Sequence, residues 1–295
     1  MPSTRANVYG RGASEELLGR LLSREGRRDR VLLSSKFHAR MNDGDPNAAG
    51  SSRRHVIDSC HDWLRRLWTD HLDVYDIHRP TSRVPIDETL RALDDLVRSG
   101  KIRYIGTSSF AAWQLIESLW VSKELHLSRV VVEQSPYSLV DRRVERELVP
   151  VARTYGIGIT VWSPLAGGLL TGKYSPQNWP QDARFPRAPA SRWEERHFTP
   201  GARGLVEVVV DVAAQKNCSP TQVAIAWILR RPGVSSVVIG VRKPQQLQDQ
   251  LGAGAVDFTE AELGRLDAVA PPGRATVPYY LDDDLADWSP ALHRW

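Results

Sequence analysis

The sequence predicts an α/β fold built on a parallel sheet, and it favours a closed (β/α)8 TIM barrel over an open sheet. Segments with a strand pattern alternate with amphipathic helical segments along most of the chain, which is typical of repeated β–α–β units. Polar side chains recur where the strands end, at Lys36, His78, Ser109 and Gln134. Only a closed barrel brings every strand end to one mouth, where barrel enzymes carry their active sites.

The clearest strand is Leu72–His78, which ends on the histidine and is followed directly by Arg79 and Pro80. Proline cannot continue a hydrogen-bonded strand, so the imidazole of His78 is expected at the carboxyl end of the sheet. His78 is therefore the first candidate for a catalytic side chain. The alternative is a hydrogen-bonded histidine of the core.

Five further segments have a strand pattern, and amphipathic helices lie between them. Strands are expected at 30–37, 102–109, 129–137, 156–164 and 234–240, and helices at 15–22, 56–67, 90–97, 111–125, 144–155, 205–216, 220–230, 243–251 and 260–269. A barrel needs eight strands, so the fold is expected to be incomplete at its amino end.

Two explanations of the short amino end stand side by side: the natural protein is longer, or the barrel is open and its function has changed. Both explanations answer the same expectation, that the loss of the first two strands would leave Val31–Phe37 and the inner face of Val237–Ile239 unpaired.

The 295 residues are expected to form one domain, with a mouth loop at 167–200 and a carboxyl-terminal tail at 271–295. A connection as long as 167–200 is uncommon unless it has a function. The aromatic side chains of both segments could line a substrate pocket, or they could only cover the barrel.

Charge and composition narrow the class of function. The formal net charge is +4, and basic residues are scattered among acidic ones, so no nucleic-acid partner is expected. No apolar run is long enough to cross a membrane, and Cys60 and Cys218 have no metal-ligand spacing. We expect a cytoplasmic protein that binds no metal and acts on a small molecule. The sequence is also compatible with a homo-oligomer.

Seven short motifs occur in one order along the chain, and together they resemble the aldo-keto reductase family. They are NVYG at 7–10, SSK at 34–36, LDVYDIHRP at 72–80, GTSS at 106–109, EQSPY at 133–137, WSPL at 162–165 and IGVRK at 239–243. The resemblance implies an NADP(H)-dependent oxidoreductase that reduces a small-molecule carbonyl on a barrel fold.

The resemblance implies three catalytic residues. Tyr9 matches the tyrosine that gives its phenolic proton to the substrate oxygen, Lys36 the lysine beside it, and His78 the histidine that orients the carbonyl. A phenol is a weak acid at neutral pH, and a nearby ammonium favours its ionised form. Without the family pattern, Tyr9 would be a packing or surface residue and Lys36 a surface lysine at a strand end.

The resemblance also implies a binding segment for each part of the cofactor. The matching residues are Ser108, Ser109 and Gln134 for the carboxamide, Trp162 for stacking on the nicotinamide, Ser163, Leu165 and Gly167 for the pyrophosphate, and Gly240, Arg242, Lys243, Gln246 and Gln250 for the adenosine 2'-phosphate. Two cations in the last segment favour NADP over NAD. The alternative is a solvated helix start.

The sequence departs from the family pattern at one catalytic position. Where the family has an aspartate that pairs with the lysine, this chain has Thr4. The leading function is NADPH-dependent reduction of an aldehyde, a ketone or a keto-sugar. The alternative is a catalytically impaired or repurposed NADP-binding barrel, such as a regulatory or scaffold protein or a dehydratase-type enzyme.

Overall fold

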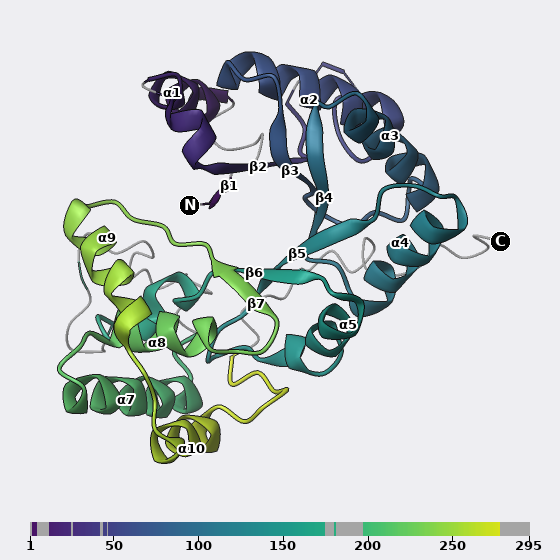
Figure 1. Ribbon diagram of the computed structural model, residues 1–295. Coiled ribbons are helices and arrows are strands. Elements are labelled where there is room, and N and C mark those ends of the chain that lie inside the picture. The colour runs from purple at the N-terminus through teal and green to yellow at the C-terminus, as the bar shows by residue number, and fades with distance from the viewer. Residues whose placement is uncertain are drawn as a thin grey trace. The chain divides into compact units, whose positions relative to one another are not determined.

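A computed structural model of the protein describes residues 2–4, 12–24, 26–41, 44–45, 47–174, 180 and 197–277 (Figure 1). Within this part the chain groups into two compact units, one up to Gln134 and one from Ser135 onward. Tyr9, most of the predicted mouth loop and the tail beyond residue 277 lie outside the described residues.

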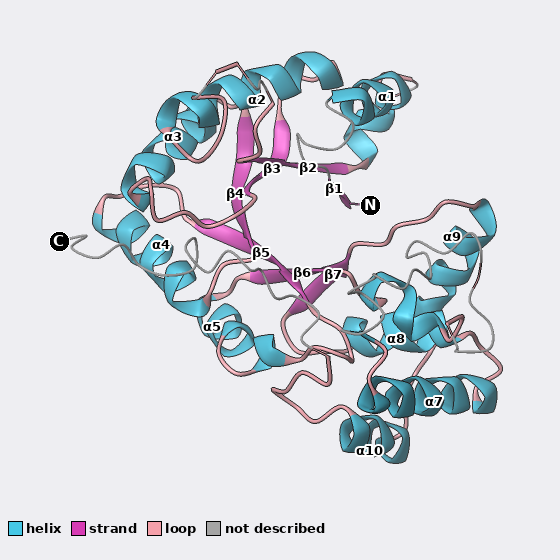
Figure 2. Cartoon of the chain, turned by 180° about the vertical axis from the view of Figure 1, so that it is seen from behind, coloured by secondary structure: helices cyan, strands magenta, loops and turns pink. Residues whose placement is uncertain are grey.

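The first unit is a parallel sheet whose strands follow one another in chain order. Its strands are β1 (Pro2–Thr4), β2 (Leu32–Phe37), β3 (Leu72–Ile77), β4 (Ile102–Ser108) and β5 (Val130–Pro136), the last of which runs on into the second unit. Its helices are α1 (Ala13–Leu22), η2 (Arg27–Arg30), α2 (Arg53–Leu67), α3 (Ile86–Arg98) and α4 (Ala112–Glu124). Figure 2 shows α2, α3 and α4 in sequence along one side of these strands.

The core of this unit buries side chains from both faces of its strands. Strands of a parallel sheet are covered on both faces, so side chains of both parities are buried. Tyr75 of β3 packs against Phe37 of β2, with ring centroids 4.9 Å apart, and its hydroxyl donates a hydrogen bond to the carbonyl of Val56 on α2. Val56, Cys60 and Trp63 complete this layer of the core.

The expected gap beside β2 is partly wrong. β1 pairs with the first half of β2 in parallel, with Pro2 beside Leu32 and Thr4 beside Ser34. The pattern at the amino end missed β1 because three residues are too few to establish an alternation.

The second unit is built around a parallel pair of strands, β6 (Gly158–Trp162) and β7 (Val234–Val237). Its helices are η3 (Arg143–Glu145), α5 (Leu148–Tyr155), η4 (Ala166–Thr171), α7 (Pro200–Gln215), α8 (Pro220–Leu229), α9 (Pro244–Leu251), η5 (Gly252–Ala255) and α10 (Glu260–Val269). Capping boxes at Ser219 and Thr259 set the starts of α8 and α10.

Val237 is the last residue of β7, whose strand partner among the described residues is β6, and Ile239 follows two residues later. Both are partly buried against a cluster of buried residues that comes from α8, η5 and the residue after η5. Their apolar area is therefore removed from water by helices of the same unit.

Candidate active site

Lys36 and His78 lie at the carboxyl ends of two neighbouring strands of the first unit. Lys36 is the residue before last of β2, and His78 directly follows β3. The backbone N–H of His78 donates a hydrogen bond to the carbonyl of Phe37, 3.2 Å away, so the ladder between β2 and β3 continues to this point. The two predicted catalytic side chains that the structure describes are thus carried by one hydrogen-bonded pair of strands.

The ammonium of Lys36 is buried beside a carboxylate. Its Nζ lies 3.7 Å from Oδ2 of Asp76, and the two side chains are only 4% and 3% exposed. Ser34 donates a hydrogen bond from its Oγ to the same Oδ2, over 2.8 Å. Burial lowers the pKa of Lys36 and raises the pKa of Asp76, and the attraction between the two groups opposes both changes.

His78 is held in its neutral form. Burial is the main cause that lowers the pKa of its imidazole to about 3, and the positive charges of Lys36 and Arg79 add to it. A neutral imidazole carries one N–H donor and one acceptor, so it can donate a hydrogen bond to a carbonyl oxygen at neutral pH.

Ser108, Ser109 and Gln134 are brought together where β4 and β5 end. The Oγ of Ser108 and the backbone N–H of Ser109 both donate to the carbonyl of Gln134, each over 3.0 Å. Ser109 has a left-handed backbone with a φ of 61°. The buried Glu133 fixes this turn, since its carboxylate accepts hydrogen bonds from Thr107 Oγ1 and from the backbone N–H of Phe110.

The loop after β6 in the second unit carries the residues predicted for the nicotinamide and pyrophosphate. Trp162 is the last residue of β6, and its carbonyl accepts a hydrogen bond from the N–H of Tyr137. Ser163, Ala166 and Gly167 all have left-handed backbones, with φ of 55°, 47° and 67°. Non-glycine residues in this region are uncommon and concentrate at functional sites, where such turns can present N–H groups to anions.

The segment predicted for the adenosine phosphate forms the start of α9. The side-chain oxygen of Gln246 accepts hydrogen bonds from the backbone N–H groups of Arg242 and Lys243, at 2.8 and 3.2 Å, and both basic side chains are exposed. Positive side chains at a helix amino terminus are suited to an anion, since the helix dipole also favours negative charge there.

Gln250 is the last residue of this segment, and its side chain is buried. Its Nε2 donates to the carbonyl of Gly240 over 3.4 Å, whereas its buried Oε1 has no hydrogen-bond partner among the described residues. A buried acceptor without a donor is costly, and the amino group of an adenine would be a suitable donor. The residues present therefore fit the adenosine end of a dinucleotide.

Two predicted positions are described only in part or not at all. Tyr9 lies outside the described residues, and Thr4 is described only through the pairing of its backbone with Ser34. Sequence reasoning also missed Asp76. The signal was present, because this aspartate lies two residues before the candidate histidine and has the same parity along the strand, which places both on one face of the sheet.

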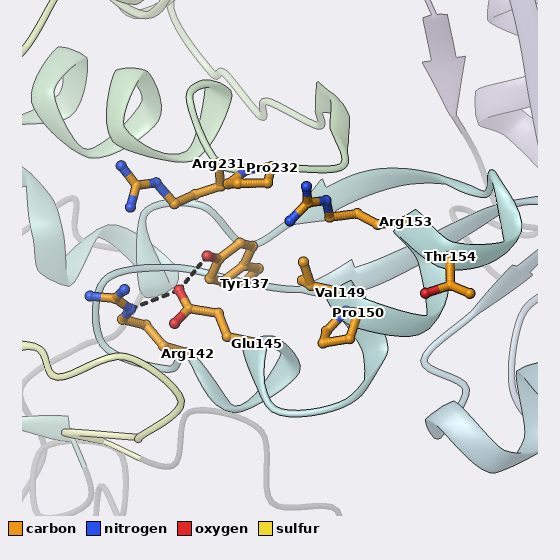
Figure 3. Close-up of a pocket in the computed structure, with 9 residues that line it drawn as sticks. All are labelled: Tyr137, Arg142, Glu145, Val149, Pro150, Arg153, Thr154, Arg231 and Pro232. Carbon is orange, nitrogen blue, oxygen red and sulfur yellow. Dashed lines mark hydrogen bonds and ion pairs between the residues drawn. The ribbon is translucent and has the colours of Figure 1, made fainter.

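A pocket of about 660 Å³ lies wholly in the second unit (Figure 3). Its lining consists of Tyr137, Arg142, Glu145, Val149, Pro150, Arg153, Thr154, Arg231 and Pro232. Tyr137 donates its hydroxyl hydrogen to Glu145, and Arg142 pairs with both Glu145 and Asp267. No predicted catalytic or cofactor-binding residue of the described chain lines this pocket, and its charges are largely engaged in holding the fold.

Comparison with known proteins places this geometry in a family. The sequence pattern of the "Aldo/keto reductase family" matches residues 5–271. The chain belongs to this family. Aldo/keto reductases are oxidoreductases with a (β/α)8 barrel fold, which confirms the predicted fold class, and the family generally uses NAD(P)H.

Three relatives illustrate the range of the aldo/keto reductase family around this chain. A "Probable voltage-gated potassium channel subunit beta" of Oryza sativa subsp. japonica is 37% identical over 84% of this chain and 76% of its own length. The "Uncharacterized oxidoreductase YrpG" of Bacillus subtilis is 35% identical over 93% and 84%. A "Putative voltage-gated potassium channel subunit beta" of Schizosaccharomyces pombe is 32% identical over 86% and 74%.

Metal-binding groups and membrane-spanning helices are both absent from the part of this aldo/keto reductase that the structure describes. No group of three or more His, Cys, Asp or Glu side chains in this part of the chain could hold a metal ion. Among the same residues, no helix combines the length and the apolar character that crossing a bilayer requires.

Proposed function

We propose that this aldo/keto reductase uses NADP(H) to reduce an aldehyde, a ketone or a keto-sugar carbonyl to the alcohol. The observation that carries the proposal is that a buried Lys36 and a neutral His78 occupy the ends of two adjacent strands. A desolvated cation and a neutral N–H donor at the carboxyl ends of barrel strands suit the polarisation of a carbonyl oxygen.

In the proposed reaction each catalytic residue has one role. His78 donates a hydrogen bond to the carbonyl oxygen and orients it. Tyr9 gives that oxygen its phenolic proton, and the positive charge of Lys36 makes the tyrosine a stronger acid. The bound dinucleotide supplies the hydride that adds to the carbonyl carbon.

Each unit by itself carries residues that the family resemblance assigns to a part of the cofactor. Ser108, Ser109 and Gln134 bind the carboxamide, Trp162 stacks on the nicotinamide, and the left-handed loop with Ser163, Leu165 and Gly167 binds the pyrophosphate. The 2'-phosphate is assigned to Arg242 and Lys243, while Gly240, Gln246 and Gln250 form the adenosine site. The exposed basic pair and the unpartnered oxygen of Gln250 support this assignment.

A cytoplasmic location and a small-molecule substrate are part of the same proposal. The location is supported by Cys60 and Cys218, neither of which forms a disulfide, and the substrate class by the polar side chains at the strand ends of the first unit.

A second candidate is a regulatory barrel that binds NADP(H) without efficient turnover. Two observations favour it: relatives of this chain are named as potassium channel β subunits, and Thr4 occupies the position of the family's catalytic aspartate. A protein with a regulatory role would retain the cofactor-binding segments and reduce carbonyl substrates only slowly.

Titration with NADPH and NADH, followed by protein and nicotinamide fluorescence, tests the cofactor assignment. We expect tighter binding of NADPH than of NADH, and we expect Arg242→Ala to weaken NADPH binding about tenfold while NADH binding changes little. Equal affinity for both nucleotides in the natural chain would contradict the assignment to NADP.

Turnover then separates the two candidates. A panel of aldehydes, ketones and keto-sugars is offered with NADPH, with Tyr9→Phe as the inactive control. Reduction by the natural chain and not by the control supports the reductase, whereas binding without turnover supports the regulatory barrel.

A further inference from the structure

We propose that Asp76 is the carboxylate that positions Lys36 in the active site. This inference rests on the reductase function proposed above and adds a positioning residue to it. The family resemblance assigns such a role to the position of Thr4 on β1, whereas the geometry points to a carboxylate on β3.

Strand register places the two side chains on one face of the sheet. Lys36 of β2 stands directly beside Asp76 of β3 in the parallel ladder, and successive side chains of a strand point to opposite faces. The backbone of Thr4 is paired with Ser34, two residues before Lys36 along β2. Asp76 is therefore the acidic residue whose place in the sheet matches that of the lysine.

The space for Asp76 comes from a glycine on the next strand. Gly106 of β4 is the partner of Asp76 in the ladder, and a Cβ built on Gly106 would lie 1.8 Å from Oδ1 of Asp76. The carboxylate thus occupies the volume that a side chain at position 106 would fill. Ser34 donates a hydrogen bond to the other oxygen, so β2 supplies the donor while β4 supplies the space.

The chemistry explains why a carboxylate is useful at this place. Burying an isolated ammonium is expensive, and an unpaired lysine in such a position tends to lose its proton. A carboxylate 3.7 Å away favours the charged form and limits the rotamers that the lysine can adopt. Asp76 touches neither substrate nor cofactor in this account and acts only through Lys36.

The pKa of Lys36 is the direct readout of this role. The chain has six lysines, Lys36, Lys101, Lys123, Lys173, Lys216 and Lys243, so the 13C-labelled side chains give a simple NMR spectrum, and Lys36→Met assigns the signal of Lys36. Asp76→Asn keeps the shape and removes the charge. We expect it to lower the pKa of Lys36 by about one unit or more.

Asp73→Asn is the matched control. Asp73 is a buried aspartate of the same strand whose position places it on the opposite face, where it pairs with Arg28 and Arg103. We expect this variant to lose stability and to leave the pKa of Lys36 unchanged. An Asp76→Asn variant that leaves the pKa of Lys36 where it is would overturn the proposal.

Kinetics provide the second readout. Asp76→Asn is expected to lower kcat/KM about tenfold or more and to move the alkaline limb of its pH profile to lower pH, with the dissociation constant of NADPH unchanged. In a Lys36→Met background Asp76→Asn should lower kcat/KM no further, because the ammonium that Asp76 positions is absent. Equal losses in both backgrounds would mean that Asp76 only holds the fold.

The two readouts keep this inference separate from the proposed function. If the natural chain reduces no carbonyl, the reductase proposal fails while the NMR titration still decides whether Asp76 controls Lys36. If the chain is active and the pKa of Lys36 does not respond, the reductase stands and the role of Asp76 falls.

Discussion

His78 owes its protonation state to its surroundings rather than to its residue type. An imidazole in water is half protonated near pH 6.5, whereas burial and the cations around His78 lower its pKa to about 3. Between about pH 6.5 and pH 3 the imidazole is therefore protonated in the unfolded chain and neutral in the folded chain. The stability that the neutral His78 confers is complete above pH 6.5 and is lost as the pH falls through that window.

His78→Gln is expected to remove this part of the pH dependence. Between pH 7 and pH 5 the natural chain should lose about 1 kcal/mol more stability than the variant, after allowance for the partial exposure of the imidazole. Urea unfolding of both proteins at the two pH values measures the difference. The expectation fails if acidification weakens the variant as much as the natural chain.

At the scale of elements, the sequence predicted most of the fold because its patterns are strong. All six expected strands are present, and α10 spans the predicted residues, since a Thr259 cap and a Glu at the third helical position announce its start. β1 could not be predicted because it is short. The register of β3 between β2 and β4 could not be predicted either, because it depends on packing across strands, and this register is what brings Asp76 beside Lys36.

Gly106→Ala tests the packing between β3 and β4. The new Cβ would meet Asp76 Oδ1 at 1.8 Å and Val132 Cγ1 at 2.8 Å, so the carboxylate must move. We expect a loss of about 2 kcal/mol or more of unfolding free energy, measured by urea denaturation. Gly264→Ala is the control, because this glycine lies in α10 with open space around it and should gain about 0.5 kcal/mol or more. A Gly106→Ala protein as stable as the natural chain would contradict the close contact.

On the scale of the whole molecule, β5 bears on how the chain unfolds. Contacts group the described residues into a unit ending at Gln134 and a unit starting at Ser135, and this boundary falls inside the single strand Val130–Pro136. When half of a strand unfolds, the other half loses stabilising contacts and becomes less ordered. Loss of one unit is therefore expected to disturb the other.

Thermal unfolding is accordingly expected to be a single transition, whose midpoint temperature rises when NADPH binds. NADPH at about 100 times its dissociation constant adds about 2.7 kcal/mol to the folded state, which for a chain of this size raises Tm by about 5 °C. Calorimetry with and without NADPH provides the measurement. Two transitions, of which NADPH moves only one, would show that the units unfold separately.

The contact between the Asp76 carboxylate and Gly106 also has a consequence for the evolution of related chains. Any side chain at this position would compete for the space of the carboxylate at position 76, so an aspartate there can be inherited only together with the glycine. Substitutions at positions 76 and 106 are thus expected to covary among the descendants of a common ancestor. In a chain with a larger residue at position 106, a carboxylate at another position would have to neutralise the buried lysine.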